Sequence, residues 1–219
     1  MPMVQAAVTI PAGDVALEGA LVLPERARGV VLFAHGSGSS RKSPRNTFVA
    51  RTLRAEGVGT LLFDLLTVAE DADYERRFEI ELLSRRLADG MRFVRDDPRT
   101  RELTVGLFGA STGAAAALQV AARFPGQVSA VVSRGGRPDL AGPAALRRVE
   151  APTLLVVGGH DYGVIELNEA AFAELRCPKE LAIVPGATHL FEEPGTLEEV
   201  ARLAAAWFVR HLATVAQRN

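Results

Sequence analysis

The sequence predicts an α/β protein in which a mostly parallel central sheet is flanked by helices. Short, uniformly apolar segments rich in valine and leucine recur along the chain, and such segments are typical of parallel strands buried on both faces. Between them lie longer segments with apolar residues at helical spacing. This alternation is the signature of strands joined by crossover helices. The longest apolar stretches have only the length of a strand, so no membrane-spanning helix and no membrane partner are expected.

Composition narrows the class of protein further. The chain has 219 residues, of which 48% are hydrophobic and 23% are charged, as expected for a single globular domain over residues 1–219. A formal net charge of −1 provides no overall field to attract nucleic acid. The first residues show no basic region followed by an apolar one, and the only cysteine, Cys177, cannot form an internal disulfide. We therefore expect a cytoplasmic protein in which Cys177 is a small buried filler.

The first half of the chain is expected to begin with an antiparallel hairpin over residues 8–23, turning at Pro11–Asp14. Ser43 followed by Pro44 predicts a helix start, because serine caps the first turn and proline fits its first position. The elements expected after the hairpin are a strand over 28–34, a helix over 43–57, a strand over 59–64, and a helix over 74–94 with Phe78 on its apolar side.

The second half continues the alternation of strands and helices. The expected strands cover 103–108, 128–133, 153–158 and 181–184, and the expected helices cover 114–123, 164–175 and 196–212. Thr196 with Glu199 predicts a capping box at the start of the last helix. The connections over 65–73 and 134–150 are too short for an inserted lid. The sequence therefore predicts no cap domain, and a pocket that is open at the carboxyl edge of the sheet.

One motif carries the strongest chemical information. Gly109-Ala110-Ser111-Thr112-Gly113 lies between an expected buried strand and an alanine-rich helix. A strand, G-x-S-x-G and a helix form a nucleophile elbow, in which a serine sits on a sharp and strained turn. Small neighbours are needed there, since bulk would collide with the adjoining strand and helix. This context predicts that Ser111 is a catalytic nucleophile.

A nucleophilic serine needs a base and a group that orients the base. Asp161 lies just after the expected strand over 153–158, and His189 lies after the next strand and before the last helix. In a nucleophile-elbow fold the acid and the base follow the serine in this order. We therefore expect a triad of Ser111, Asp161 and His189, with Asp139 and Glu166 as the rival acids. The other histidines have plainer interpretations: a structural hydrogen bond for His35, and loop or surface roles for His160 and His211.

Backbone N–H groups are expected to bind the oxyanion of the reaction. The strand over 28–34 runs into His35-Gly36-Ser37-Gly38, where small residues allow close approach to a substrate carbonyl. The expected donors are the amides of Ser37 and of Thr112, the residue after the nucleophile. A phosphate-binding loop is a poor alternative, because neither G-x-x-x-x-G-K-[ST] nor G-x-G-x-x-G occurs at this point.

These motifs together resemble the α/β-hydrolases, and within them the small, lidless, dienelactone-hydrolase-like proteins. The resemblance rests on the segments 35–38, 109–113, 158–161 and 186–189, and it extends from about Val8 to about Leu212. It implies an α/β-hydrolase fold and a catalytic triad, and it says little about the substrate. Dienelactone hydrolases proper use a cysteine nucleophile, whereas this chain has Ser111. Dienelactone is therefore not implied as the substrate.

The predicted function is a serine hydrolase that cleaves small carboxylic esters or thioesters with water, through an acyl-enzyme and without a metal or cofactor. Two alternatives stay open, a non-catalytic ligand-binding protein on the same scaffold and an acyltransferase. A homodimer is also left open by the sequence.

Several basic residues are expected near the carboxyl edge of the sheet. They are Arg41, Lys42, Arg45, Arg134 and Arg137. Such residues, above all Arg41, Arg134 and Arg137, could form a subsite for a carboxylate or phosphate of the substrate. The alternative is ordinary surface charge, with Arg137 paired to Asp139.

Overall fold

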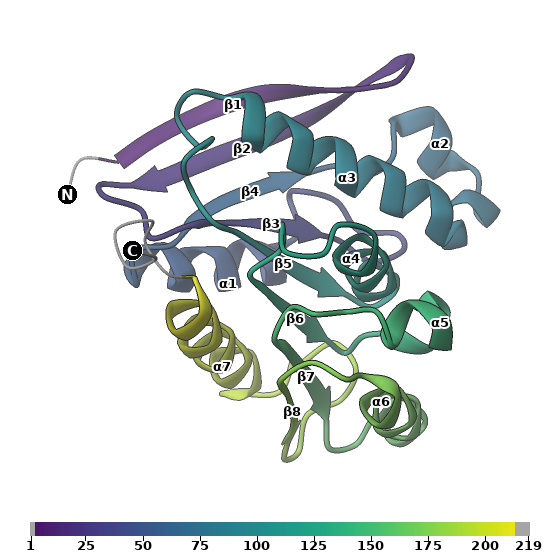
Figure 1. Cartoon of the computed structure of the whole chain (residues 1–219). Helices are drawn as coiled ribbons and strands as arrows, with labels where there is room; N and C mark the ends of the chain where they lie inside the picture. Colours follow the sequence, from purple (N-terminus) through teal and green to yellow (C-terminus); the bar gives the residue numbers. More distant parts are fainter. Residues whose placement is uncertain (1–2, 213–219) are drawn as a thin grey trace.

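Residues 3–212 are described by the computed structural model, and they form one eight-stranded sheet between two layers of helices (Figure 1). Met1 and Pro2, part of the N-terminal segment considered above, lie outside the described residues. The strand order is β1-β2-β4-β3-β5-β6-β7-β8. The strands are β1 (Met3–Ala12), β2 (Val15–Pro24), β3 (Val30–Ala34), β4 (Gly59–Phe63), β5 (Val105–Ala110), β6 (Ala130–Arg134), β7 (Thr153–Gly158) and β8 (Lys179–Val184).

The direction of the strands agrees with the expected mostly parallel sheet. β1 and β2 form the predicted antiparallel hairpin, which starts earlier than expected, and β2 also runs antiparallel to β4. From β4 through β3 to β8 every neighbouring pair is parallel. The carboxyl ends of these strands therefore meet at one edge, where ligands bind in open α/β sheets.

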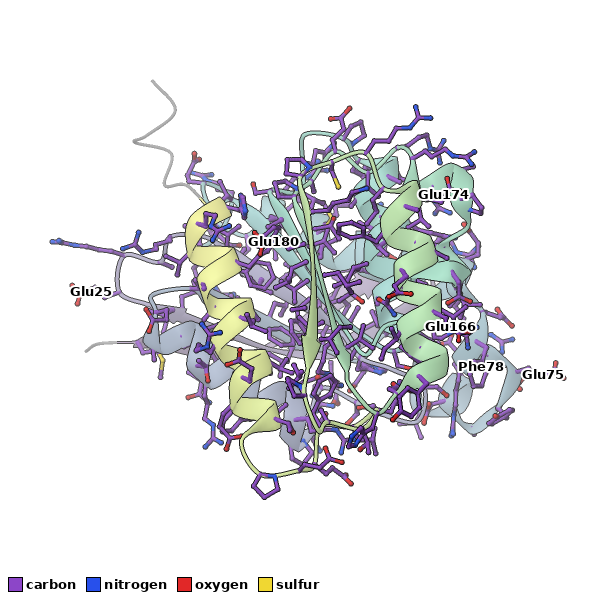
Figure 2. All side chains as sticks on the ribbon, turned by 90° about the horizontal axis from the view of Figure 1, so that it is seen from below. Glu25, Glu75, Phe78, Glu166, Glu174 and Glu180 are labelled. Atoms are coloured by element: carbon purple, nitrogen blue, oxygen red, sulfur yellow. The ribbon has the colours of Figure 1, made fainter. Side chains whose placement is uncertain are left out.

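Helices cover both faces of the sheet, as Figure 1 shows. α1 (Pro44–Ala55) and α7 (Thr196–His211) pack together on one face, and α3 (Ile80–Asp96), α4 (Thr112–Arg123), α5 (Pro143–Leu146) and α6 (Tyr162–Glu174) lie on the other. In Figure 2 the edge strand β8 is seen between α7 and α6, with side chains filling the space on both sides. The central strands β3 and β5 are buried along their whole length, which explains their uninterrupted apolar sequences.

The helix expected over residues 74–94 is wrong at its start. The connection after β4 contains a short helix α2 (Val68–Ala72) and a 3-10 turn η1 (Glu75–Phe78), and α3 begins only at Ile80. Glu79, with a ψ angle of 81°, interrupts the helical backbone between them. Phe78, expected on the apolar side, is 43% exposed and lies at the periphery of the molecule (Figure 2).

The capping box predicted for Thr196 and Glu199 is also wrong. Gly195, with a φ angle of 81°, is the N-cap of α7, and no side chain caps this helix. The Thr196 hydroxyl instead donates to the carbonyl of Glu193 at 2.7 Å. A complete capping box occurs at α2, between Thr67 and Glu70.

The remaining helix starts and connections follow the prediction more closely. Ser43 caps α1 by accepting a hydrogen bond from the amide of Asn46, and Pro44 occupies the first turn. The connection over 134–150 holds a 3-10 turn η2 (Pro138–Ala141) and the single turn of α5, with no inserted lid. Over residues 3–212, no helix is long and apolar enough to cross a membrane.

Glu70 is predicted to matter far more for stability than Glu199. The Glu70 side chain accepts from the Thr67 amide and pairs with Arg86, and both partners of this ion pair are largely buried. Glu70→Gln should reduce the free energy of unfolding by more than about 2 kcal/mol, because it leaves a buried guanidinium without its counter-charge. Glu199→Gln breaks only an exposed ion pair with Arg202 and should change the free energy of unfolding by less than about 0.5 kcal/mol. Urea unfolding of both variants measures these changes, and equal losses of stability would contradict the prediction.

Candidate active site

Ser111 occupies the strained turn that the elbow motif predicts. It lies between β5 and α4 with φ 50° and ψ −121°, one of three non-glycine residues with positive φ in the described chain. Its backbone is held on both sides: the amide donates to the carbonyl of Arg134 at 3.2 Å, and its carbonyl accepts from the amide of Arg137 at 3.1 Å. Non-glycine residues in this region are costly and are found where the surroundings enforce them.

The glycines of the motif allow two turns to meet without side chains between them. A Cβ atom on Gly113 would lie 2.1 Å from the carbonyl oxygen of Ala34, and one on Gly109 would lie 2.4 Å from the Cα of Ala114. A Cβ atom on Gly36, on the turn after β3, would lie 3.0 Å from the Cβ of Ser111. The elbow and the turn over 35–38 are therefore in direct backbone contact.

Asp161 and His189, the two residues that the sequence predicts as orienting acid and base, lie within hydrogen-bond distance of each other. The Nδ1 of His189 lies 2.6 Å from an Oδ2 of Asp161, and the aspartate side chain is the more buried of the two. Asp161 is at the start of α6, directly after the strand β7 and its terminal glycines. A carboxylate that accepts a hydrogen bond from Nδ1–H leaves Nε2 of the imidazole free to take a proton from a nucleophile.

Backbone contacts fix the two loops that carry this pair. The amides of Gly159 and His160 donate to the carbonyls of Val184 and Ala187 at 2.8 and 2.9 Å. The loop before α7 is held further by Glu193, which accepts from the amide and the hydroxyl of Thr188 at 3.1 and 2.6 Å. Sequence reasoning missed this clamp, because the carboxylate follows the histidine by only a few residues and gives no recognisable motif.

The 134–137 segment brings the serine and the histidine to the same place. Gly135 has a φ angle of 49°, and a Cβ atom there would lie 3.1 Å from the carbonyl and 3.6 Å from the Cε1 of His189. The neighbouring backbone of Arg134 and Arg137 binds Ser111. Within residues 3–212 the Ser111 hydroxyl has no hydrogen bond to His189, and such bonds commonly tighten only when substrate binds.

Ser37 and Thr112, the expected oxyanion donors, lie next to each other. The amide of Ser37 donates to the hydroxyl of Thr112 at 3.1 Å, and Thr112 is the first residue of α4. The amide of Thr112 has no acceptor in the described part of the chain, as expected for the first turn of a helix. The two N–H groups are thus adjacent, and the Ser37 amide would share its proton between the hydroxyl and an oxyanion.

The arginines proposed for substrate binding differ sharply. Arg41 forms ion pairs with Asp64 and Glu18, and Arg137 forms a two-fold pair with Asp139 at 2.9 and 2.7 Å. Both guanidinium groups are therefore engaged, and Asp139 is occupied away from His189. Arg134 is 7% exposed, and among the described residues its side chain has no hydrogen-bond or ion-pair partner. Of the three, it is the one still free to bind a ligand.

The remaining polar candidates have structural roles. His35 is buried and accepts a hydrogen bond from the amide of Leu65 at 2.9 Å, and burial lowers its pKa. His160 is exposed, and His211 packs on Trp207 with ring centroids 4.5 Å apart. Burial raises the pKa of the Cys177 thiol, so this side chain is an inert filler as expected. No cluster of three or more metal-ligating side chains is found between residues 3 and 212.

Comparisons with known proteins bear on the family and the fold of the chain. The model of the dienelactone hydrolase family matches residues 17–217. A crystal structure of dienelactone hydrolase from Anabaena variabilis is 54% identical, with a TM-score of 0.92, covering 95% of this chain and 98% of that one. Est1E from Butyrivibrio proteoclasticus shares the fold, with a TM-score of 0.81 at 15% identity over 94% of this chain and 98% of its own.

Curated relatives come from two strains of Mycobacterium tuberculosis, H37Rv and CDC 1551, and their names provisionally describe a phosphoribosyl transferase. Each is 56% identical over 211 residues, which is 96% of this chain and 47% of the relative. The chain thus spans about half the length of these curated relatives.

Gly113→Ala is expected to be the most damaging small substitution in the site. The added Cβ would overlap the backbone of the turn after β3, which cannot move without displacing the strand. The free energy of unfolding should fall by more than about 4 kcal/mol, or the protein should fail to fold. Gly163→Ala is the control, since nothing lies within 4 Å of an added Cβ there and the residue is helical. Its effect should stay within about 1 kcal/mol. Thermal unfolding of both variants measures the two losses of stability. A Gly113→Ala protein as stable as wild type would show that the backbone contact at Gly113 is not as tight as described.

Proposed function

This chain belongs to the dienelactone hydrolase family, and we propose that it is a serine hydrolase acting on small carboxylic esters or thioesters. The observation that supports the proposal is that Ser111, on its strained elbow, and His189, held by Asp161 at 2.6 Å, both adjoin the 134–137 segment. The proposed catalytic residues are Ser111, Asp161 and His189, with the amides of Ser37 and Thr112 as oxyanion donors.

The proposed reaction proceeds in two steps. His189 takes the hydroxyl proton as Ser111 attacks the carbonyl carbon, and the negative charge on the carbonyl oxygen is stabilised by the two amides. The imidazolium is stabilised by Asp161 and gives its proton to the departing alcohol or thiol. Water, deprotonated by His189, then attacks the acyl-enzyme and releases the acid and the serine.

The names of the relatives do not define the substrate. Serine replaces the cysteine of dienelactone hydrolases proper, and a serine hydroxyl depends more on its base, since cysteine is intrinsically more nucleophilic. The phosphoribosyl transferase name refers to proteins about twice as long as the matched part. We therefore propose hydrolysis for this chain. The transferase name applies to the longer relatives as whole proteins and is not carried over to this chain.

Hydrolysis of p-nitrophenyl esters and acyl-CoA thioesters tests the proposal directly. Wild type should turn over members of this panel, and Ser111→Ala should lower kcat by about 10⁴-fold or more, because triad residues act as a unit. Circular dichroism of the variant provides the check on folding. Residual activity within tenfold of wild type would show that Ser111 is not the nucleophile.

Asparagine substitutions distinguish the two candidate acids. Asp161→Asn keeps the shape of the site and removes the carboxylate that accepts from His189, so kcat should fall by about 10³–10⁴-fold. Asp139→Asn only breaks the pair with Arg137, and kcat should change by less than about threefold. Steady-state kinetics of the two variants on one ester makes the comparison. A larger loss for Asp139→Asn would reverse the assignment.

A preference for short acyl groups is expected from the polar cleft beside the oxyanion turn. This cleft has a volume of about 490 Å³ and is lined mainly by serines and charged residues over 37–45. A longer acyl tail would gain little of the roughly 0.8 kcal/mol available per buried methylene. The value of kcat/KM should therefore level off or fall beyond about four to six carbons. A steady rise from acetate to decanoate esters would reveal an apolar tunnel, for instance one completed by a second copy of the chain.

A further inference from the structure

Arg134 is a buried cation without a counter-charge. It ends β6, its Nε and Nη1 atoms are buried, and neither has a hydrogen-bond partner within residues 3–212. Its guanidinium carbon lies 6.0 Å from the centroid of the Phe191 ring. Burial lowers the pKa of Arg134 to about 10, which leaves the group charged at neutral pH. An unpaired buried charge is strongly destabilising, so a folded protein keeps one only where something else balances it.

A second arginine, Arg45, adds to the uncompensated positive charge around Arg134. Arg45, on the first turn of α1, lies close enough to Arg134 for the two positive charges to interact, and its Nε is also buried and unpartnered. Its Nη1 pairs with Glu192 at 3.1 Å. That carboxylate offsets Arg45 alone, and the positive charge of Arg134 remains. The N-terminus of α1, a helix of 12 residues, adds further positive potential.

This charged group adjoins the reaction centre. Arg45 and Ser37 line the same cleft of about 490 Å³, together with Lys42, Asp71 and the hydroxyls of Ser39, Ser40 and Ser43. The Asp71 carboxylate is paired with Arg77, and Arg134 is buried and does not itself line the cleft. The segment that contains His189 continues through Phe191 and Glu192, which contact Arg134 and Arg45. A molecule whose carbonyl sits at the Ser37 amide could therefore place another group against Arg45, whose charge interacts with that of Arg134.

We propose that Arg134 and Arg45 bind a phosphate group of the substrate, with Lys42 at the mouth of the cleft. This inference rests on the proposed function, because the phosphate would be carried by the ester or thioester that Ser111 attacks. The unpaired guanidinium offers several N–H donors in one plane, and Arg45 offers a further donor from a second element. A tetrahedral phosphate can accept from several directions at once and carries up to two negative charges, which suits this arrangement.

Phosphate binding can be measured without any substrate turnover. Thermal unfolding is followed in increasing inorganic phosphate, with ionic strength held constant by sodium chloride. Wild type and Ser111→Ala should both gain about 3 °C or more in Tm at a phosphate concentration about tenfold above the dissociation constant. Arg134→Met should lose this gain, and without phosphate its Tm should be at least that of wild type, since a buried unpaired charge has been removed.

Matched variants make the test specific. Arg202→Met removes one positive charge from an exposed pair on α7 and should keep the full phosphate-dependent gain. Should Arg134→Met fail to fold, Arg45→Met takes its place and should weaken phosphate binding about tenfold or more. Inorganic phosphate should also inhibit p-nitrophenyl acetate hydrolysis competitively in wild type, and at least about tenfold less strongly in Arg134→Met.

Other results would either overturn the phosphate site or separate it from the proposed function. No phosphate-dependent gain in wild type, or a full gain in Arg134→Met, would overturn the proposal. An equal gain with acetate would do the same, because it would indicate a carboxylate subsite. If phosphate stabilises the protein and no ester is hydrolysed, the proposed function fails and the phosphate site stands.

Discussion

Direct backbone contact between the turn after β3 and the elbow after β5 is the constraint on which the site depends. The parallel register of the two strands places Ala34 opposite Gly109, so both turns leave the sheet at the same level. Gly113 then packs against the Ala34 carbonyl with no room for a side chain. This contact forces Ser111 into its positive φ angle and sets the Ser37 amide beside Thr112. The proposed nucleophile and the proposed oxyanion donors are thus positioned by one packing interaction.

The sheet and the acid–base pair could be predicted because both follow from local patterns. Each strand of the parallel part is a short apolar run, and Asp161 and His189 each come shortly after such a run. Parallel strands deliver their carboxyl ends to one edge, so distant residues meet there without any long-range signal in the sequence. Gly135 and the Thr188–Glu193 clamp could not be found this way, since their roles exist only once the loops are folded against each other.

Helix ends and charge partners were less predictable, for a common physical reason. Thr196 has the capping sequence, yet Gly195 adopts the left-handed conformation and takes the N-cap position, while the threonine hydroxyl turns back to Glu193. Arg41, Arg134 and Arg137 look alike in sequence, yet the structure pairs two of them and buries the Arg134 side chain without an ion pair or hydrogen bond over residues 3–212. In each case several partners compete over small energy differences, and the tertiary fold selects one of them.

The central claim is that the strained elbow presents Ser111 as an activated nucleophile, and covalent labelling measures this most directly. The protein is incubated with a fluorophosphonate, which phosphonylates activated serines, and its intact mass and peptides are determined by mass spectrometry. One label per chain is expected, on the peptide that contains Ser111. A folded protein that takes up no label, or that carries it on another residue, would rule out Ser111 as an activated nucleophile and favour a non-catalytic binding protein on this scaffold.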